Sequence, residues 1–351
     1  MLFFRNDYGQ GCVEPILKLL TEANDESFPG YGTDKYTQKA KELLMAKMPG
    51  HNVDIHFLVG GTIINVTTLR HMLRPWEGVI CPDTGHINTH ETGAIEAAGH
   101  KIIPVPNASG KLTAASVRKA CEAHMLNYEH MIKPAAVYIS NATELGTVYT
   151  RRELEELRAV CNEQGLYLYM DGAGLGNALE SDVDYDLNDL AGWMDAFTIG
   201  GTKNGALFGE ALVITNESVK PFFRFTEKMS GAMLAKGWLL GLQFIGLFEE
   251  DTWFKSAKHA NDLAAQIQAK ATQLGYPLMM KSDTNQIFLV VTPKEYEYLS
   301  SRVDFEIWDR WEDTIVIRFV TSWHTEKDEA DYLCVYLEEA KNLEKEEAEA
   351  E

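Results

Sequence analysis

Residues 166–205 read LYLYMDGAGLGNALESDVDYDLNDLAGWMDAFTIGGTKNG, and this stretch decides the fold. Two strand-like runs, LYLYM at 166–170 and DAFTI at 195–199, flank a segment long enough to hold a helix. An aspartate ends the first run, and a glycine-rich turn with a lysine ends the second. Strand, helix and strand in this order predict a βαβ unit, whose two polar ends lie at the same edge of a parallel sheet.

The same alternation extends over residues 53–215. Further strand-like runs there are VDIHFLV, GVIC, KIIPV, AAVYIS and EALVI, and segments with helical periodicity separate them. The clearest helix begins at Thr150, where Glu153 completes a capping box, and Gly165 ends it. We therefore expect a large α/β domain, built on a mostly parallel seven-stranded sheet with helices on both faces.

The pattern changes after about residue 235. Two long helical segments, GWLLGLQFIGLFEE and SAKHANDLAAQIQAKATQLG, precede the strand-like runs QIFLVVT, FEIWDRW and TIVIRFV and a last helix. This order predicts a smaller α+β domain. Since no repeat or proline-rich linker intervenes, we expect two closely packed domains that share a cleft, with residues 15–240 in the large domain and residues 1–14 and 241–351 in the small one.

The composition is that of a folded, enzyme-sized protein, with 351 residues of which 45% are hydrophobic and 24% charged. The formal net charge of −20 opposes binding to nucleic acid or to an anionic membrane surface, so we expect neither partner. The longest apolar stretch, residues 237–248, is too short to cross a bilayer. The five cysteines include no CxxC pair, which argues against a disulfide framework or a zinc knuckle. The N-terminus lacks a signal-peptide pattern. Both observations lead us to expect a protein of the reducing cytoplasm.

Two strand ends carry side chains suited to chemistry. Lys203 lies in the turn GGTKNG at 200–205, where small neighbours let a lysine lie against a flat ligand and form a Schiff base; a solvated surface lysine is the alternative. Asp171 ends the run LYLYM, and a carboxylate in this apolar setting needs a cationic partner such as a protonated pyridine nitrogen. A helix N-cap is the alternative for Asp171.

Two loops add further candidates. Gly60-Gly61-Thr62 follows a strand-like run and precedes a helical segment, so bare N–H groups and a hydroxyl there suit a phosphate, although a plain turn would read the same way. His86 and His90 follow GVIC and are four residues apart, which raises a metal site. Because no further ligand pattern accompanies them, we expect no metal, and instead an imidazole stacked on a cofactor ring.

Taken in order, these motifs resemble the fold-type I pyridoxal-phosphate enzymes, specifically the threonine aldolase and β-eliminating lyase family. The resemblance covers most of the chain and is carried by YGTD at 31–34, GGTIIN at 60–65, GHINTHETGAIEAAGHK at 85–101, YISNATELGTVYT at 138–150, MDGA at 170–173, GGTKNG at 200–205 and IRFVTSW at 317–323. It implies the α/β fold of aspartate aminotransferase, pyridoxal 5'-phosphate as cofactor, and a homodimer or homotetramer with the site at the subunit interface.

The resemblance also implies roles for the residues that match the family's motifs. Lys203 would form the Schiff base with the cofactor's aldehyde, Asp171 would keep the pyridine nitrogen protonated, and His86 would stack on the ring. The residues implied to hold the phosphate are Gly61, Thr62 and Thr202.

The substrate side is implied in the same way. Arg318 matches an arginine that binds the substrate carboxylate, and Asn6 with Asp7 matches a pair near the substrate. Thr143 stands where some aldolases have a second histidine. The residues positioned to reach a neighbouring subunit's site are Tyr31 and Lys236.

One motif departs from the family. The family usually reads DGAR, whereas this chain reads Asp171-Gly-Ala-Gly174, which removes a guanidinium that would pair with the substrate carboxylate.

The activity that the resemblance implies is cleavage of the Cα–Cβ bond of a β-hydroxy amino acid, such as threonine to glycine and acetaldehyde. Two other hypotheses stay open: β-elimination or transamination of an aromatic or sulfur amino acid, and a cofactor-binding protein whose catalysis has decayed.

Overall fold

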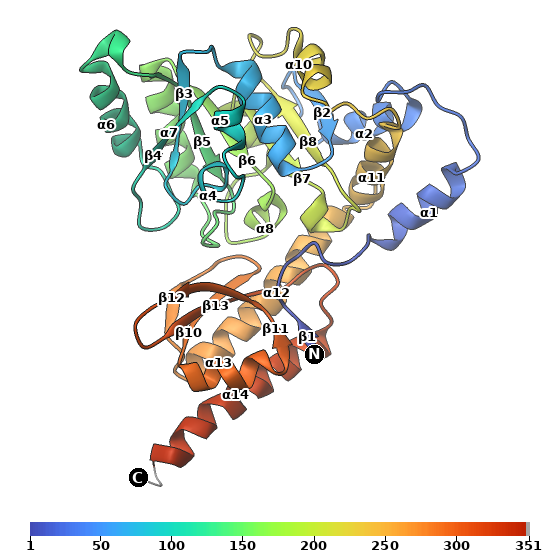
Figure 1. The fold of residues 1–351 in the computed structure, drawn as a ribbon. Coiled ribbons are helices and arrows are strands. Elements are labelled where there is room, and N and C mark those ends of the chain that lie inside the picture. Colours follow the sequence, from blue (N-terminus) through green and yellow to red (C-terminus); the bar gives the residue numbers. More distant parts are fainter. Residues whose placement is uncertain (349–351) are drawn as a thin grey trace.

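A seven-stranded sheet forms the centre of the computed structural model, which describes residues 1–348 (Figure 1). The strand order is β2-β8-β7-β6-β5-β3-β4. β8 is antiparallel to both of its neighbours, and the other pairs are parallel, so the predicted mostly parallel sheet is confirmed. The strands are β2 (Asp54–Leu58), β3 (Glu77–Pro82), β4 (Lys101–Val105), β5 (Lys133–Ser140), β6 (Tyr167–Asp171), β7 (Ala196–Gly200) and β8 (Glu210–Ile214).

Helices cover both faces of this sheet. Alternate side chains of β6 show why its run is continuously apolar: Leu168 and Met170 join the core on one face, and Tyr169 joins the core on the other. The first face is covered by α1 (Glu14–Ala23), α2 (Lys35–Met45), α6 (Ala114–Met125), α7 (Arg151–Gln164), α8 (Leu175–Leu179), α9 (Leu187–Trp193) and α11 (Trp238–Phe248). The second is covered by α3 (Gly61–Met72), α4 (His86–Thr89), α5 (Ala94–Ala97) and α10 (Phe223–Met229).

The helix α7 has the ends that its sequence predicts. The Thr150 side chain accepts a hydrogen bond from the backbone N–H of Glu153, and the Glu153 carboxylate accepts one from the backbone N–H of Thr150. Gly165 ends the helix with φ 66°, a left-handed conformation that glycine adopts without steric cost. This helix fixes the connection between β5 and β6, and so the position of the strand that ends in Asp171.

The small domain contains a four-stranded antiparallel sheet with the order β12-β13-β10-β9. Its strands are β9 (Leu278–Met280), β10 (Gln286–Val291), β12 (Glu306–Arg310) and β13 (Ile315–Val320), and α13 (Pro293–Ser300) and α14 (Lys327–Ala348) pack with it. The N-terminal strand β1 (Leu2–Phe3) pairs in parallel with β11 (Val303–Asp304), so the first residues of the chain lie beside its last third.

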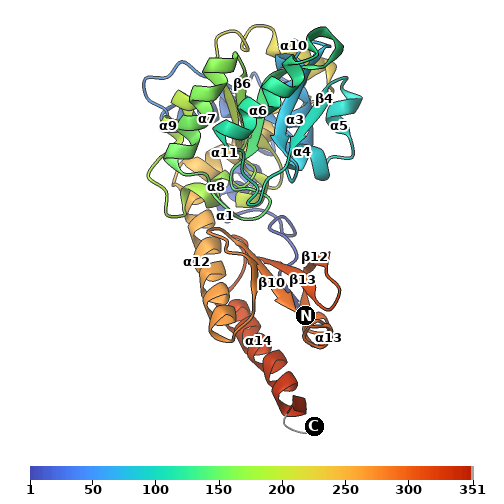
Figure 2. The same ribbon diagram turned by 90° about the vertical axis from the view of Figure 1, so that its left-hand side faces the viewer.

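One helix, α12 (Thr252–Gln273), runs from the large domain into the small one (Figure 2). Trp253 at its start belongs to a core of the large domain, and Leu263 and Ile267 belong to the core of the small domain. α11 spans the predicted boundary at residue 240 and packs on α1 and α2, and the domain limits drawn from the sequence stay a prediction.

Within residues 1–348, no helix combines the length and the apolar character needed to cross a bilayer. All five cysteines are free thiols, and four of them are buried.

Candidate functional site

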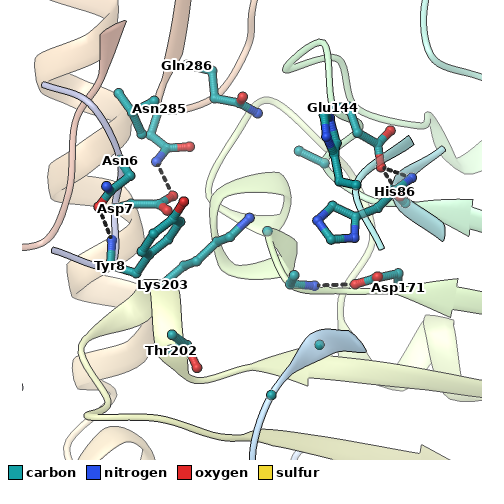
Figure 3. Close-up of a pocket in the computed structure, with 18 of the residues that line it drawn as sticks. Asn6, Asp7, Tyr8, His86, Glu144, Asp171, Thr202, Lys203, Asn285 and Gln286 are labelled. Atoms are coloured by element: carbon teal, nitrogen blue, oxygen red, sulfur yellow. Dashed lines mark hydrogen bonds between the residues drawn. The ribbon is translucent and has the colours of Figure 1, made fainter. Parts of the chain in front are cut away.

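A cavity of about 510 Å³ lies where the carboxyl ends of the large-domain strands face the small domain (Figure 3). The large domain contributes the ends of β6 and β7 and the first turn of α3. The small domain contributes the start of β10 together with β12 and β13, and the N-terminal segment adds residues 6–8. Of the residues predicted from the sequence, those that line the cavity are Asn6, Asp7, Gly61, Thr62, His86, His90, Thr143, Asp171, Thr202, Lys203 and Arg318.

Lys203 lies in a short 3₁₀ turn, η2 (Thr202–Asn204), directly after β7. The turn needs its glycines: Gly205 has φ 100°, and a Cβ on it would lie 2.5 Å from the Cγ1 atom of Val13. The carbonyl oxygen of Gly200 accepts a hydrogen bond of 2.6 Å from the indole N–H of Trp253. Figure 3 shows the Lys203 side chain pointing into the cavity toward His86, so the surface-lysine alternative is wrong.

Asp171 is buried at the end of β6 and accepts three hydrogen bonds. Its Oδ2 atom accepts from the hydroxyl of Tyr138 at 2.9 Å and from the amide of Asn65 at 2.8 Å, and its Oδ1 atom accepts from the backbone N–H of Ala173 at 3.0 Å. Burial raises the pKa of Tyr138 well above its usual range, so this phenol stays a donor. Gly174 precedes α8, so Asp171 is not the N-cap of that helix.

His86 begins α4 and is held at two atoms. Its Nδ1 atom lies 2.9 Å from Oε1 of Glu91, and its backbone N–H donates to Oε1 of Glu144 at 2.9 Å. Burial by itself lowers the pKa of His86, but the hydrogen bond to Glu91 and the charge of Asp171 outweigh burial, so the pKa is raised. The pKa of His90 is lowered, first by burial and then by the charges of His86 and Arg318.

The first turn of α3 offers room for an anion. A Cβ added to Gly60 or Gly61 would meet no heavy atom within 4 Å, and both residues and Thr62 line the cavity. The first backbone N–H groups of a helix have no intrahelical partner, and they carry the positive end of its dipole. Thr202 also lines the cavity, and its hydroxyl accepts from the N–H of Gly209 at 3.0 Å.

The small domain supplies a guanidinium. Nη1 of Arg318 donates to Oε1 of Gln286 at 3.0 Å, and Nη2 forms an ion pair with Glu306. The Nε atom of Arg318 is buried and has no hydrogen-bond partner among the described residues. Gly174 also lines the cavity, and a Cβ placed on it would lie 3.4 Å from the backbone nitrogen of Ala142, an ordinary contact distance.

Tyr31 and Lys236 lie away from the cavity of their own chain. The backbone N–H of Tyr31 donates to the carbonyl of Ala235 at 3.0 Å, so the two segments are neighbours. The Lys228 ammonium lies 4.2 Å from the centroid of the Tyr31 ring, and the Tyr31 side chain is exposed. Their predicted role at a neighbouring subunit's site stays a prediction.

Sequence reasoning missed the residues that hold the predicted ones in place, chiefly Asn65, Glu91, Tyr138 and Glu144. All four lie within the motifs that carry the family resemblance, and an asparagine among the apolar residues of a helix was a usable signal. His86, Glu91 and Asp171 each place one atom that could ligate a metal ion within 4.8 Å of the others. Asn65 joins Glu91 to Asp171 by two hydrogen bonds, and His86 contacts Glu91 directly. The absence of a metal stays a prediction.

Known proteins resemble this chain over nearly its whole length. It is 31% identical over 335 residues to a low specificity L-threonine aldolase of Pseudomonas sp. (strain NCIMB 10558), which covers 92% of this chain and 93% of that protein. A solved threonine aldolase structure from Leishmania major superposes with a TM-score of 0.95 at 41% identity, covering 97% of this chain and 100% of the other. Aspartate aminotransferase of Thermus thermophilus has a TM-score of 0.70 at 13% identity, which shows a common fold alone.

The model of the family described as beta-eliminating lyase matches residues 18–294. This range includes β2 to β8, the first turn of α3, and the turn that carries Lys203. The chain therefore belongs to the beta-eliminating lyase family and has the type I fold of pyridoxal-phosphate enzymes.

Proposed function

We propose that this protein is a pyridoxal-phosphate-dependent aldehyde-lyase that cleaves the Cα–Cβ bond of a β-hydroxy amino acid, as a low-specificity threonine aldolase does. The observation that carries the proposal is the meeting of Lys203, Asp171 and His86 in one cavity, in a chain that resembles aldolases over more than nine tenths of its length. Threonine or allo-threonine would give glycine and acetaldehyde.

The residues of the cavity fit pyridoxal phosphate. The open glycine backbone of α3 and the hydroxyl of Thr202 would hold the phosphate, Lys203 would bind the aldehyde carbon, and Asp171 would pair with the ring nitrogen. His86 would cover one face of the ring. When bound, this cofactor supplies the conjugated system that accepts the electron pair of the broken carbon–carbon bond.

The protein's own residues would choose the bond and move the proton. Arg318 lines the cavity, and its guanidinium would give a substrate carboxylate a charge-assisted hydrogen bond, which fixes the orientation of the groups on Cα. As the bond breaks, a base must take the proton of the β-hydroxyl. Imidazoles of His86 and His90 both line the cavity, and an ordered water is the alternative base.

The cofactor is tested by its colour and its attachment. The purified protein should absorb visible light, and borohydride reduction followed by peptide mapping should find pyridoxal on Lys203. The variant Lys203→Ala should lose this trapping. A colourless protein that takes up no pyridoxal phosphate would contradict the proposal.

The reaction is tested with four amino acids: threonine, phenylserine, tyrosine and cysteine. Glycine should form from the first two only. Release of pyruvate and ammonia from cysteine, or of an oxo acid from tyrosine, without glycine from threonine, would instead support β-elimination or transamination. Absence of all products with the cofactor bound would support decayed catalysis, for which Gly174 is the specific reason.

We also propose a homodimer or homotetramer in the cytoplasm. Support for a second subunit comes from two exposed apolar side chains on either side of Arg224, which donates to the Tyr31 carbonyl: Phe222 is 76% exposed and Phe225 75%. Exposed apolar clusters of this kind commonly mark protein interfaces. Support for a reducing compartment comes from the five free thiols. An active monomer in sedimentation would overturn the oligomer.

A further inference from the structure

Glu91 lies directly behind the cavity wall, with a fully buried side chain. One of its oxygens, Oε1, lies 2.9 Å from Nδ1 of His86 and accepts a hydrogen bond of 2.8 Å from the amide of Asn65. The other oxygen has no partner among the described residues. Because buried carboxylates are costly unless they are hydrogen-bonded, this uneven arrangement needs an explanation.

Asn65 connects this carboxylate to the one at the end of β6. Its Nδ2 atom donates both to Glu91 and to Oδ2 of Asp171, each at 2.8 Å. Its Oδ1 atom accepts from the hydroxyl of Tyr169 at 2.7 Å, and burial raises the pKa of Tyr169 well above its usual range, so this phenol keeps the proton that it donates. Because carboxylate oxygens only accept, the amide orientation of Asn65 is fixed, with its NH₂ group toward both carboxylates.

The fixed amide determines which nitrogen of His86 carries the proton. Oε1 of Glu91 already accepts from Asn65 and is an acceptor toward His86 as well, so Nδ1 must be the donor. In the neutral imidazole, the second nitrogen, Nε2, is then a bare acceptor. Since Glu91 engages the ring at Nδ1, Nε2 is the nitrogen left for the cavity (Figure 3).

We propose that Glu91 and Asn65 are positioning residues that hold His86 in the Nδ1–H form, so that Nε2 takes the β-hydroxyl proton. This inference rests on the proposed function for its substrate. The β-hydroxyl proton moves to Nε2 and the Cα–Cβ bond breaks. The C–O bond on Cβ becomes the carbonyl of the released aldehyde, and the electron pair of the Cα–Cβ bond stays with Cα. The positive charge that forms on His86 is then balanced by Glu91 through the Nδ1–H bond, and the proton is available to return to Cα.

Several charged groups face His86 and shape its titration. Besides Glu91, they are Asp171 at the end of β6, Glu144, which accepts from the backbone N–H of His86, Lys203 in the turn after β7, and His90 at the C-terminal end of α4. The carboxylates favour the charged imidazole, Lys203 opposes it, and the charge of His86 in turn lowers the pKa of His90. The variant Glu91→Gln keeps the shape and an acceptor oxygen but removes the nearest negative charge.

The first test reads the tautomer without any turnover. The protein is labelled with ¹⁵N-histidine, and His86 is assigned by its loss in His86→Phe. Long-range ¹H–¹⁵N spectra of the protein without cofactor should show Nδ1 protonated and Nε2 bare above the pKa of His86. In Glu91→Gln that pKa should fall, and in Glu91→Ala both tautomers should be populated.

The second test is a double-mutant cycle on the holoenzyme. Glu91→Gln should lower kcat by about tenfold to a hundredfold, part of the roughly 10²- to 10⁴-fold that a general base contributes, and should shift the acid limb of the pH profile with little change in KM. In the His86→Phe background the same substitution should have no further effect. Glu91→Asp, which restores the charge, should recover part of the shift of the pH profile.

Glu227→Gln is the matched control. Glu227 is also a buried carboxylate beside a histidine ring, with Oε2 lying 3.3 Å from Nδ1 of His56, and neither residue lines the cavity. This variant should leave the His86 tautomer and its pKa as they are in the unmodified protein.

The inference is overturned if Glu91→Gln leaves the tautomer and pKa of His86 unchanged, or if its effect on kcat adds fully to that of His86→Phe. The tautomer is measured without substrate, so it can fail while glycine is still produced. Conversely, a normal His86 titration in a protein that makes no glycine from any β-hydroxy amino acid would refute the proposed function and leave the positioning of His86 by Glu91 intact.

Discussion

Gly174 is the residue at which this chain departs from its family's usual motif. The ordinary contact distance between an added Cβ and Ala142 means that a Cβ atom fits there without moving the backbone. Arg318 is then the only arginine among the described residues that line the cavity, and Lys203 is the only lysine. A second guanidinium at position 174 would restore the bidentate grip on a carboxylate that the family's motif supplies.

Gly174→Arg should therefore lower the KM for L-threonine. A hydrogen bond to a charged group contributes about 1.5–3 kcal/mol, which corresponds to a decrease of about tenfold or more. Steady-state kinetics measure the effect. Gly174→Met fills the same space without charge and should give no such decrease; if it does, the gain comes from packing, and the carboxylate argument is wrong.

Glu210 predicts how stability depends on pH. Burial raises the pKa of Glu210 to about 7, while in the unfolded chain the group titrates near its ordinary value of 4.5. Between these values the folded protein keeps a proton that the unfolded chain has lost, so the contribution of Glu210 to stability falls as pH rises through this window. Its Oε2 atom accepts from the N–H of Gly201 at 2.9 Å, and a glutamine oxygen can accept the same bond.

Glu210→Gln should consequently be more stable than the unmodified protein at about pH 8, and the advantage should disappear by about pH 4.5. Urea denaturation of the cofactor-free protein at a series of pH values measures this difference. An advantage that grows toward acid pH would show that the carboxylate is stabilised by its surroundings rather than penalised by burial.

At the level of elements, Trp253 connects the start of α12 to the turn that carries Lys203. Its ring is fully buried, and its indole N–H is the donor to the carbonyl of Gly200. Trp253→Phe keeps most of the apolar packing but leaves that buried carbonyl without this donor. The expected cost is about 1–3 kcal/mol of unfolding free energy, together with weaker cofactor binding because the turn loosens.

Thermal melting and cofactor titration measure the two effects of Trp253→Phe. Trp193→Phe is the control, because Trp193 packs only partly buried at the far end of α9 and contacts Arg151 rather than the turn. If both variants bind the cofactor equally well, the hydrogen bond to Gly200 does not hold the turn.

The elements were predictable where a local pattern specifies them. Strand β6 reads as buried because both of its faces are apolar, and α7 carries its caps in its own sequence. The direction of β8 was not predictable from its run EALVI, since periodicity does not encode strand direction. The short connection from Gly200 to Glu210 is what turns β8 back along β7, because a parallel crossover needs a dozen or more residues.

The residues of the site were predictable where they end a strand, and not where tertiary packing alone brings them in. Asp171 and Lys203 end strands, so the rule that parallel strand ends share an edge brings them together. Asn65 and Glu91 come from a helix and from the segment after α4, and only the packing of α3 over β6 brings them to Asp171. No local pattern specifies such a contact.

Across the whole molecule, the net charge of −20 means that a phosphate and a carboxylate must be held by local groups. The cavity provides the α3 N-terminus on one side and Arg318 on the other, with Lys203 between the domains. Tyr31 lies outside its own cavity, so its predicted role requires a second copy of the chain.

Mixed oligomers test that requirement. Chains carrying Lys203→Ala and chains carrying Tyr31→Ala should each form impaired oligomers, but a hybrid should regain part of the activity. In the hybrid, one site combines an intact Lys203 with the partner's intact Tyr31. Assays of differently tagged, co-purified hybrids measure the recovery.

Lys203→Ala mixed with Asp171→Asn is the control hybrid. Because both residues line the cavity of the same chain, neither site in that hybrid is complete, and it should stay inactive. A Lys203→Ala and Tyr31→Ala hybrid without recovery would place the action of Tyr31 within its own chain.

The continuous helix α12 also has a mechanical consequence. With 22 residues it is about 33 Å long, and an α-helix of this length behaves as a stiff rod. The rod is anchored at Trp253 beneath the lysine turn, while its distal half is embedded in the small domain. A displacement of the small domain that tilts α12 would therefore be transmitted through Trp253 to the carbonyl of Gly200, next to the turn that carries Lys203.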